Sequence, residues 1–455
     1  MNNIFLFFKI LKTDGIKRAF CCFYYKIRKL KFPEIDEIYF PRKPSINSYM
    51  IPDLLRDSNK KNKIIVSCAF RPLMGPTGGP NGVLYVEQNI FGNSYKGIPL
   101  YYMFQSKLPF FYPPVLEDAI KDLARMVKIN FYAAYSFDFC NPIWSKYSNR
   151  NDVIFVCHDL GFAYGAYLKN IPYVLIYHTQ GSYVNEREGF GEKFSEKDKE
   201  ITYKMEELVF SNALKVFFPS KGAEEVFRIT AKINFDKLKF SEYPLYNTIS
   251  DKPKKLNIEK VRTQFHLPLF DKNAKVFLSC GDYSSNKGME RVPLFLNKYV
   301  EMYGEKVVWI GIGSKHTAGI YEQLLEEKSD WKFDAYLFGE RTIHDNLLSL
   351  MEISDYYIMF HRNSIFDLST LEAMRAQNGL ILTEVGGNIE VNKNNNVIFV
   401  NPEDDCSLEK AATELHGKNK EEFKLLNESV FNGYFSKENF KKSYEKLFND
   451  IIELV

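Results

Sequence analysis

The chain has 455 residues, of which 45% are hydrophobic, and its 60 basic and 57 acidic residues leave a formal net charge of +3. This length suits two domains of roughly 200 residues each, because a single hydrophobic core stops growing beyond about 250–300 residues. The nearly balanced charge argues against a general nucleic-acid-binding protein, so we expect no nucleic-acid partner.

The first residues are basic and amphipathic. The chain has no run of 18 apolar residues, and the short apolar patch at residues 4–8 is not followed by a small-residue cleavage site, so we predict neither a membrane span nor a secretory signal. Residues 9–31 hold eight basic residues and one acidic residue among aromatic and aliphatic ones. We assign residues 1–45 to a segment that can lie on an anionic membrane surface or pack as a basic helix on the neighbouring domain.

Strand-like runs alternate with helical stretches in residues 46–245, which predicts a domain with a parallel sheet and crossover helices. The expected strands are 63–70, 129–136, 152–158, 173–178 and 214–220, and the expected helices are 115–127 and 199–213. The loop at 75–85 has four glycines, which let the backbone approach a ligand closely. His158 and His178 end two of the strands, where backbone groups can also satisfy them.

Residues 241–260 are polar and lack periodicity, and we place a linker at 246–260. Six short apolar runs follow in residues 261–430: 274–281, 306–314, 333–340, 355–361, 379–384 and 396–401. They predict a second doubly wound sheet, in which ligands gather at the carboxyl ends of the strands. A closing helix is expected within 431–455, with apolar residues at helical spacing.

The cysteines predict free thiols. Their number, seven, is odd, and no Cys-x-x-Cys pair occurs. Four of them lie in or at the ends of apolar runs: Cys68, Cys140, Cys157 and Cys280. This pattern indicates a reducing compartment, so we expect a cytoplasmic protein. The chain also has no Asp-x-Asp and no ligand set with metal spacing, so we predict no metal site.

The stretch 360–402 carries the clearest chemistry. It predicts a loop, a helix, a strand, a Gly-Gly turn and a second strand. Asp367 can cap the helix, and the first amides of such a helix form a ready site for phosphate. Glu372 follows one turn later and can point its carboxylate at hydroxyl groups beside that phosphate, as on a nucleotide ribose.

This stretch resembles the donor-binding core of the retaining GT-B glycosyltransferases, above all glycosyltransferase family 4. The family pattern runs Glu-x7-Glu-Ala-Met, then Gly-Gly-x-x-Glu. The matching positions are Glu372, Ala373, Met374, Gly386, Gly387 and Glu390, while Ser364 stands at the position of the first Glu. The resemblance implies an α/β protein of the GT-B fold: two Rossmann-like doubly wound parallel-sheet domains that face a cleft, with the C-terminal helix crossing back to the first domain.

The start of the second half is similar to the Gly-Arg-x4-Lys-Gly motif with which the family grips the donor diphosphate. Gly281, Lys287 and Gly288 match in spacing, and Asp282 replaces the arginine. An acidic group at 4 Å repels phosphate by about 1 kcal/mol or more even in water, so we expect Asp282 to turn away. Arg362, and after it Arg291, are the candidates to supply the missing cation.

The resemblance also implies roles for individual residues. The expected catalytic residues are His178, Lys287 and Glu372. The expected donor-binding residues are Gly79, Gly281, Lys287, Gly339, Arg341, Arg362, Ser364, Asp367, Leu368, Glu372, Gly386 and Gly387. The expected acceptor contacts are His158 and Asn185, the latter in a charged, mobile acceptor loop at 185–200. His361, Glu384 and Asn388 are further candidates to touch the transferred sugar.

The function implied by the resemblance is transfer of a hexose or N-acetylhexosamine from a nucleotide diphosphate sugar to a glycan acceptor with retention of configuration. No cofactor and no metal are expected. Together with the basic segment at 1–45, the resemblance suggests that the acceptor is a lipid-linked oligosaccharide at the cytoplasmic face of the membrane. The process would be bacterial surface polysaccharide synthesis. Two alternatives remain: a non-catalytic GT-B subunit that binds glycan or a partner glycosyltransferase, and a nucleotide-sugar 2-epimerase.

Overall fold

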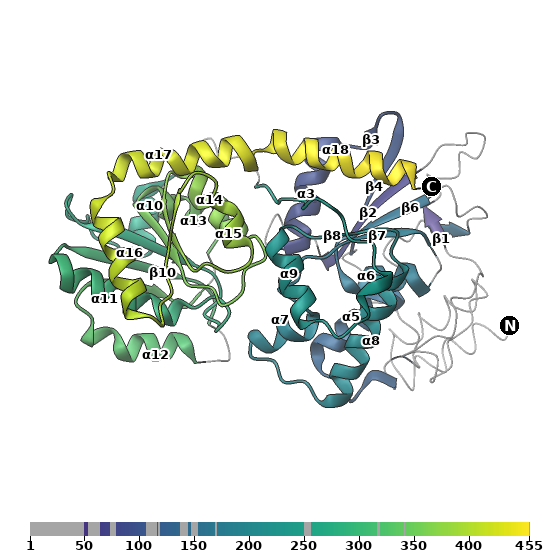
Figure 1. Cartoon of the computed structure of the whole chain (residues 1–455), viewed down its shortest axis with the longest axis horizontal. Helices are drawn as coiled ribbons and strands as arrows, with labels where there is room; N and C mark the ends of the chain where they lie inside the picture. The colour runs from purple at the N-terminus through teal and green to yellow at the C-terminus, as the bar shows by residue number, and fades with distance from the viewer. Residues whose placement is uncertain are drawn as a thin grey trace.

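The computed structural model shows two α/β domains side by side, with the C-terminal helices running along both of them (Figure 1). The structure describes residues 50–52, 64–72, 79–105, 116, 119–136, 144–146, 153–168, 171–249, 256–315, 319–340 and 342–454. The predicted basic segment at 1–45 and the predicted donor contact Arg341 lie outside these residues. No helix in the described ranges has both the length and the apolar character needed to cross a membrane.

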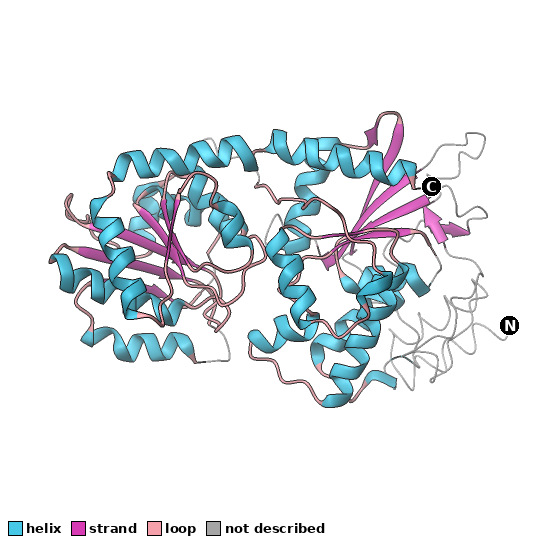
Figure 2. Ribbon diagram, in the orientation of Figure 1, coloured by secondary structure: helices cyan, strands magenta, loops and turns pink. Residues whose placement is uncertain are grey.

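The N-terminal domain is built on a six-stranded sheet of order β3-β4-β2-β6-β7-β8, parallel except for the β3–β4 pair. Its strands are β2 (Ile64–Pro72), β3 (Ser94–Tyr95), β4 (Ile98–Gln105), β6 (Val153–Cys157), β7 (Tyr173–Ile176) and β8 (Val216–Phe217). A separate antiparallel pair joins β1 (Met50–Pro52) to β5 (Trp144–Lys146). β6 and β7 are apolar at every position because helices cover both faces of the sheet (Figure 2).

The helices of this domain are α3 (Gly79–Phe91), α5 (Arg125–Ser136), α6 (Leu160–Leu168), α7 (Tyr183–Gly189), α8 (Glu196–Asn212) and α9 (Lys221–Thr230), with a 3-10 turn, η3 (Phe235–Lys237). Alternate residues of β6 enter two different cores. Val153, Phe155 and Cys157 pack with α5, α6, α8 and α9 on one face of the sheet. Ile154 and Val156 pack with α3 and the C-terminal helix on the other.

Several predictions for the first half were wrong. The predicted strand 129–136 is the end of α5, because a short apolar run in a buried helix looks like a strand. The longest strand missing from the prediction is β4, and the short strands β1, β3 and β5 were not predicted either. The predicted helix 115–127 is confirmed only in part: the described residues 116, 119 and 120 are helical, and α5 begins at Arg125. The Gly-rich loop becomes α3 from Gly79 onward, and the predicted loop 185–200 holds the end of α7 and the start of α8.

The C-terminal domain contains all six predicted strands in one parallel sheet of order β11-β10-β9-β12-β13-β14. They are β9 (Lys275–Cys280), β10 (Val307–Ile312), β11 (Asp334–Phe338), β12 (Tyr356–Met359), β13 (Gly379–Leu382) and β14 (Val397–Phe399). The helices around them are α10 (Ile258–Gln264), α11 (Val292–Tyr303), α12 (Ile320–Glu327), α13 (His344–Glu352), α14 (Leu368–Arg375), α15 (Gly387–Val391) and α16 (Asp405–Gly417), with 3-10 turns η4 (Met289–Arg291) and η5 (Lys328–Asp330). One continuous core holds them together.

The chain then returns to the N-terminal domain, as predicted. α17 (Lys420–Val430) continues through a π-helical segment, η6 (Phe431–Phe435), into α18 (Lys437–Glu453), which lies on the N-terminal sheet (Figure 1). Phe440, Tyr444, Leu447, Phe448 and Ile451 are buried there. Each large apolar side chain buried in this way stabilises the fold by roughly 1.5–3 kcal/mol. α18 therefore fastens the two domains together.

Candidate functional site

A cleft of about 390 Å³ lies between the carboxyl ends of the two sheets. Its wall includes five residues that the sequence analysis selected: Gly79, His158, His178, Lys287 and Asp367. The first three come from the N-terminal domain and the other two from the C-terminal domain. Ligands of parallel α/β sheets bind at this end of the strands.

Lys287 and Asp367 form the centre of the C-terminal wall. The Lys287 Nζ lies 2.6 Å from Asp367 Oδ1, and the buried His361 places its Nε2 3.1 Å from Asp367 Oδ2. Burial alone raises the pKa of the Asp367 carboxyl, but Lys287 and His361 beside it lower that pKa to about 2. Burial lowers the pKa of His361 to about 4. At neutral pH the cluster is therefore a carboxylate and an ammonium beside a neutral imidazole.

Asp367 stands at the N-cap position of α14, but its side chain makes no cap hydrogen bond. The prediction that it caps the helix is therefore wrong: its carboxylate holds Lys287 and His361 instead, and Ser364 Oγ donates to it over 3.3 Å. With no side-chain cap from the described residues, the start of α14 keeps its positive dipole end for another anion. Leu368, the first residue of the helix, approaches Gly82 of α3 across the domain boundary.

Two glycines explain how Lys287 reaches this place. Gly281 ends β9 with a φ of 149°, and the stem of Lys287 packs over its Cα. Gly288 has a φ of 63°, and a Cβ there would lie 1.9 Å from the carbonyl oxygen of Phe360. Only glycine lets the loop sit so close to the end of β12. The spacing of Gly281, Lys287 and Gly288 therefore has a structural reason.

Asp282 is one of the residues that line the cleft, and Ser314 Oγ donates to its Oδ1 over 2.8 Å, so its turning away from the phosphate stays a prediction. Arg362 and Arg291 instead line a separate hollow of about 780 Å³ beyond β13 and β14. Arg362 pairs with Glu290, and Arg291 donates to the Phe360 carbonyl and pairs with Glu403. Neither arginine replaces the missing cation in the cleft.

A cation that the sequence analysis missed does line the cleft. Arg187, on α7, lies over the rings of Tyr183 and Phe190 and pairs with Glu186 at 3.1 Å. Its Nε is buried and finds no hydrogen-bond partner within the described part of the chain. The residue was hidden in the charged stretch 185–200, because such stretches usually form solvated surfaces. Asn185 in that stretch turns to the Gln180 carbonyl, 2.9 Å away, and is not part of the cleft wall.

α7 is docked on the loop that carries Lys287. Ser285 Oγ donates to the carbonyl of Gly189 over 2.7 Å, and Asn286 Nδ2 donates to the carbonyl of Glu186 over 3.4 Å. A Cβ on Gly189 would collide with the Asn286 side chain. The helix with Arg187 and the loop with Lys287 are thereby fixed to each other although they belong to different domains.

The two histidines contact each other. His158 Nδ1 lies 3.1 Å from His178 Nε2, and the rings stack at 5.3 Å. The other ring nitrogen of His158 lies 3.3 Å from Glu87, a buried carboxyl on α3. Burial lowers the pKa of His158 to about 3 and that of His178 well below its usual value. The backbone-satisfied alternative therefore fails for His158, whose two nitrogens both face side chains.

Glu372, a predicted catalytic residue, is buried on α14 and is not part of the cleft wall; its carboxylate is held by His344 of α13 at 2.5 Å. The hydrogen bond to Glu372 raises the pKa of His344. His344 is a further residue that the sequence analysis missed, because its partner lies 28 positions away. Gly339 is covered by the side chains of Lys315 and Tyr321. The ribose and base contacts of Glu372 and Gly339 remain predictions.

The Gly-Gly pair has a packing role in the structure. Cβ atoms on Gly386 and Gly387 would lie 2.0 Å and 2.1 Å from the carbonyl oxygens of Ser364 and Ile365. Gly386 also meets Gly222 of α9 backbone to backbone. Next to this turn, Asn388 Nδ2 donates to the Thr383 carbonyl over 3.0 Å and lies 3.5 Å from His361. Glu384 lines the hollow beyond β13 and β14. The pair therefore joins the domains, and its predicted donor contact stays a prediction.

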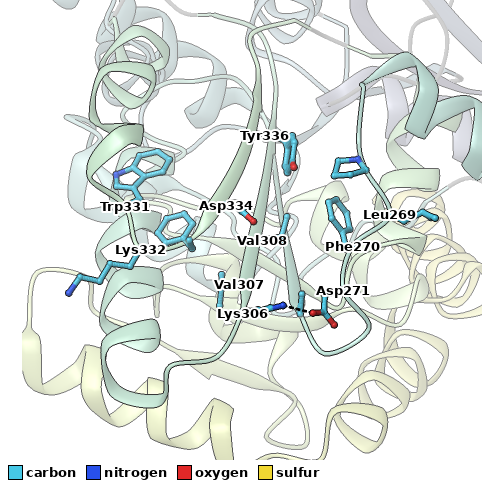
Figure 3. A pocket seen from close by; sticks show the side chains of 13 residues that line it. Leu269, Phe270, Asp271, Lys306, Val307, Val308, Trp331, Lys332, Asp334 and Tyr336 are labelled. Carbon is cyan, nitrogen blue, oxygen red and sulfur yellow. Dashed lines mark hydrogen bonds and ion pairs between the residues drawn. The ribbon is translucent and has the colours of Figure 1, made fainter.

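Another hollow, of about 550 Å³, lies at the opposite, amino ends of β10 and β11 (Figure 3). Phe270, Trp331 and Tyr336 line it, and Lys306 pairs with Asp271 at one side. The amino end of a parallel sheet is not where such folds bind their substrates. We therefore take the cleft between the domains as the functional site.

Comparison with known proteins shows the fold. No protein-family model matches the chain, and no curated protein matches its sequence. The N-terminal domain of Candida albicans trehalose-6-phosphate phosphatase matches with a TM-score of 0.58 at 14% identity, over 86% of this chain and 97% of that one. Sucrose-phosphate synthase from Thermosynechococcus elongatus matches with a TM-score of 0.57 at 13% identity, over 86% of this chain and all of that one.

Anabaena HepE in complex with UDP and glucose matches with a TM-score of 0.53 at 14% identity, over 85% of this chain and all of that one. At such low identities the likeness shows the fold alone. The chain has the GT-B fold, as the sequence predicted: two parallel-sheet domains that face a cleft, closed by a returning C-terminal helix.

Proposed function

We propose that the protein is a glycosyltransferase that takes a sugar from a nucleotide diphosphate donor bound in the cleft. The observation that carries the proposal is the placement of the Lys287 ammonium beside the uncapped start of α14. A cation and a helix N-terminus at one point form an anion site of the kind that a diphosphate needs. Structures of the same fold support the choice of donor, since HepE was solved with UDP-glucose.

The cleft offers a second source of positive potential from the opposite domain. α3 begins at Gly79 in the cleft wall, so its N-terminus also faces the ligand space. Arg187 adds a guanidinium there. In this proposal Arg187 takes the part of the arginine that Asp282 replaces. The diphosphate is then held between the two domains.

The leaving diphosphate gains negative charge as the bond to the sugar breaks. Lys287, Arg187 and the amides of α14 stabilise that charge because they are fixed in place before the reaction. A phosphate at Lys287 competes with Asp367 for the ammonium, and the released carboxylate can accept hydrogen bonds from sugar hydroxyls. Glu372 binds the ribose, and His178 faces the sugar and the incoming hydroxyl from the other domain.

The finer parts of the proposal rest on the resemblance of the sequence to family 4. They are a hexose or N-acetylhexosamine donor, retention of configuration without a metal, and a glycan acceptor in the form of a lipid-linked oligosaccharide at the cytoplasmic membrane face. Surface polysaccharide synthesis is the process that such a reaction serves. The basic segment at 1–45 is the part of the chain that would meet the membrane.

One observation favours a non-catalytic GT-B subunit as a second candidate. The cleft wall holds Asp159, Glu186, Glu192, Asp282 and Asp367, more acids than cations. Carboxylates bind sugar hydroxyls well and diphosphates poorly. A glycan-binding subunit therefore binds oligosaccharide but neither UDP nor GDP.

The deciding experiment measures binding of UDP and GDP by calorimetry and nucleotide release from UDP- and GDP-sugars with a glycan acceptor. Lys287→Ala should weaken nucleotide binding on the order of tenfold or more, since a hydrogen bond to a charged group contributes about 1.5–3 kcal/mol. Lys332→Ala is the matched control, because Lys332 is exposed and pairs with Glu301 away from the cleft. The proposal is contradicted if the Lys287→Ala variant binds UDP and GDP as tightly as the native protein, or if the native protein binds glycan but no nucleotide. Conversion of the donor sugar to its epimer would identify an epimerase.

A further inference from the structure

Glu87 is a fully buried carboxyl in the middle of the N-terminal domain. It lies on α3 and is 0% exposed. Ser67 Oγ, from β2, donates to Glu87 Oε1 over 2.6 Å, and Glu87 Oε2 lies 3.3 Å from His158 Nε2. Burying a carboxyl in an apolar core costs free energy unless the group is protonated or hydrogen-bonded.

Side chains lead from Glu87 to the cleft. Glu87 Oε2 and His158 Nε2, 3.3 Å apart, are both buried and have no hydrogen-bond partner among the described residues, so a proton between them is what would join the two groups. His158 is itself fully buried, and its Nδ1 lies 3.1 Å from His178 Nε2. His178 is 9% exposed and lines the cleft across from Lys287. A buried carboxyl is thereby joined to the site wall through two imidazole rings.

Each histidine in this chain of contacts carries a single ring proton. Burial lowers the pKa values of both histidines far below neutrality, so each ring is neutral and carries one N–H. A protonated Glu87 donates to His158 Nε2; His158 Nδ1–H then donates to His178 Nε2, and the His178 proton must sit on Nδ1. An ionised Glu87 accepts from His158 Nε2–H; His158 Nδ1 accepts from His178 Nε2–H, and His178 Nδ1 is bare.

We propose that Glu87 is a positioning residue that sets, through His158, whether the remaining nitrogen of His178, Nδ1, is a hydrogen-bond donor or an acceptor. The role in sugar transfer rests on the proposed function, whereas the coupling among the three side chains does not. Only O–H and N–H bonds change in this step, and no bond between heavy atoms is made or broken. Ionising Glu87 releases one proton to solvent and moves the ring proton of each histidine to its other nitrogen.

The surroundings of Glu87 favour the neutral carboxyl at neutral pH. Burial raises the pKa of Glu87 to about 8, against which the Ser67 hydrogen bond acts in part. The other titratable groups that face it are Tyr102 of β4 and Tyr444 of α18, and burial raises the pKa of both above the usual value. Those phenols stay neutral. His178 Nδ1 is then a donor at about pH 7 and an acceptor above about pH 8.

The test uses the full chain with ¹⁵N-labelled histidine. NMR spectra at about pH 6.5 and about pH 9.5 bracket the titration of Glu87. The His178 Nδ1 signal, assigned by its absence from a His178→Gln variant, should move from the protonated to the unprotonated range in the native protein. Glu87→Gln should hold it in the protonated range at both pH values, because the amide always donates to His158 and still accepts from Ser67.

Glu206→Gln is the matched control. Glu206 is equally buried, and burial raises its pKa to about 7, but its partners are the Tyr177 hydroxyl and the Tyr183 amide. This variant should switch the His178 tautomer as the native protein does. The proposal is overturned if the His178 tautomer of the native protein is the same at both pH values. It is also overturned if the His178 tautomer of the Glu87→Gln variant changes with pH as it does in the native protein.

Activity gives a second readout. If the donor form of His178 is the active one, turnover of the native enzyme should fall roughly tenfold between about pH 7 and about pH 9, while Glu87→Gln should lose less than about twofold. A native enzyme and variant with the same pH profile contradict the inference. A protein that transfers no sugar at all contradicts the proposed function, and the NMR result then still decides the role of Glu87.

Discussion

Replacing Glu87 by Gln should protect the folded protein against alkaline pH. A carboxyl whose pKa is 4.5 in the unfolded chain and about 8 in the folded one binds its proton more tightly when folded. The stability that comes from this proton is fully present below pH 4.5 and is lost as the pH rises through 8. With 1.36 kcal/mol for each unit of pKa, the native protein loses roughly 3 kcal/mol between about pH 5 and about pH 8. The Gln side chain does not titrate, so the variant loses none of it.

Differential scanning calorimetry at both pH values measures the effect. For a domain of this size, 1 kcal/mol shifts the Tm by roughly 2–4 °C, so the Tm difference between variant and native protein should change by roughly 6–12 °C in favour of Gln. Glu225→Gln is the control, because Glu225 is exposed on α9 of the same domain, and its Tm should follow the native value. A Tm difference that is the same at both pH values would show that Glu87 is ionised in the folded protein.

Two further predictions concern the contacts between the domains and around the donor site. Asp367→Asn should bind UDP roughly tenfold more tightly in calorimetry, because the Asp367 carboxylate no longer competes for Lys287; weaker or unchanged binding would refute competition. Gly222→Ala should separate the domains and increase the radius of gyration in X-ray scattering, because its Cβ would lie 2.4–2.6 Å from the backbone of Gly386. Gly417→Ala, where a Cβ meets nothing within 4 Å, should leave the scattering unchanged.

The C-terminal domain was the easier half to predict, for a physical reason. Four of its six strands, β9, β10, β12 and β13, are short apolar runs buried on both faces, and several strands are followed by a glycine where the chain must turn sharply. Gly288 must be glycine for the loop to reach Phe360, so the spacing that carries Lys287 is visible in one sequence. The position of Lys287 could therefore be predicted from the sequence, whereas the pairing of Asp367 with Lys287 and His361, in place of the expected helix cap, could not.

The first half was harder because its signals are ambiguous. An apolar stretch such as 129–136 fits a buried helix and a strand equally well, and only the packing of α5 against α6 decides between them. There Gly161 leaves room for Asn130 and Ala133. Contacts between side chains far apart in the sequence could not be predicted either. No pattern in the sequence indicates that Arg362 pairs with Glu290.

The position of Arg187 links donor binding to the arrangement of the domains. Asp282 stands where the glycosyltransferases that the sequence resembles carry an arginine, and Lys287 is the cation among the described C-terminal residues that line the cleft. In the proposed site the second cation is on α7, whose last carbonyls are held by Ser285 and Asn286. If the domains separate, these two hydrogen bonds break and Arg187 leaves Lys287 at the same time. In the proposed site, the motion that opens the cleft therefore also weakens diphosphate binding. Donor affinity then depends on domain closure as well as on the residues of the C-terminal domain.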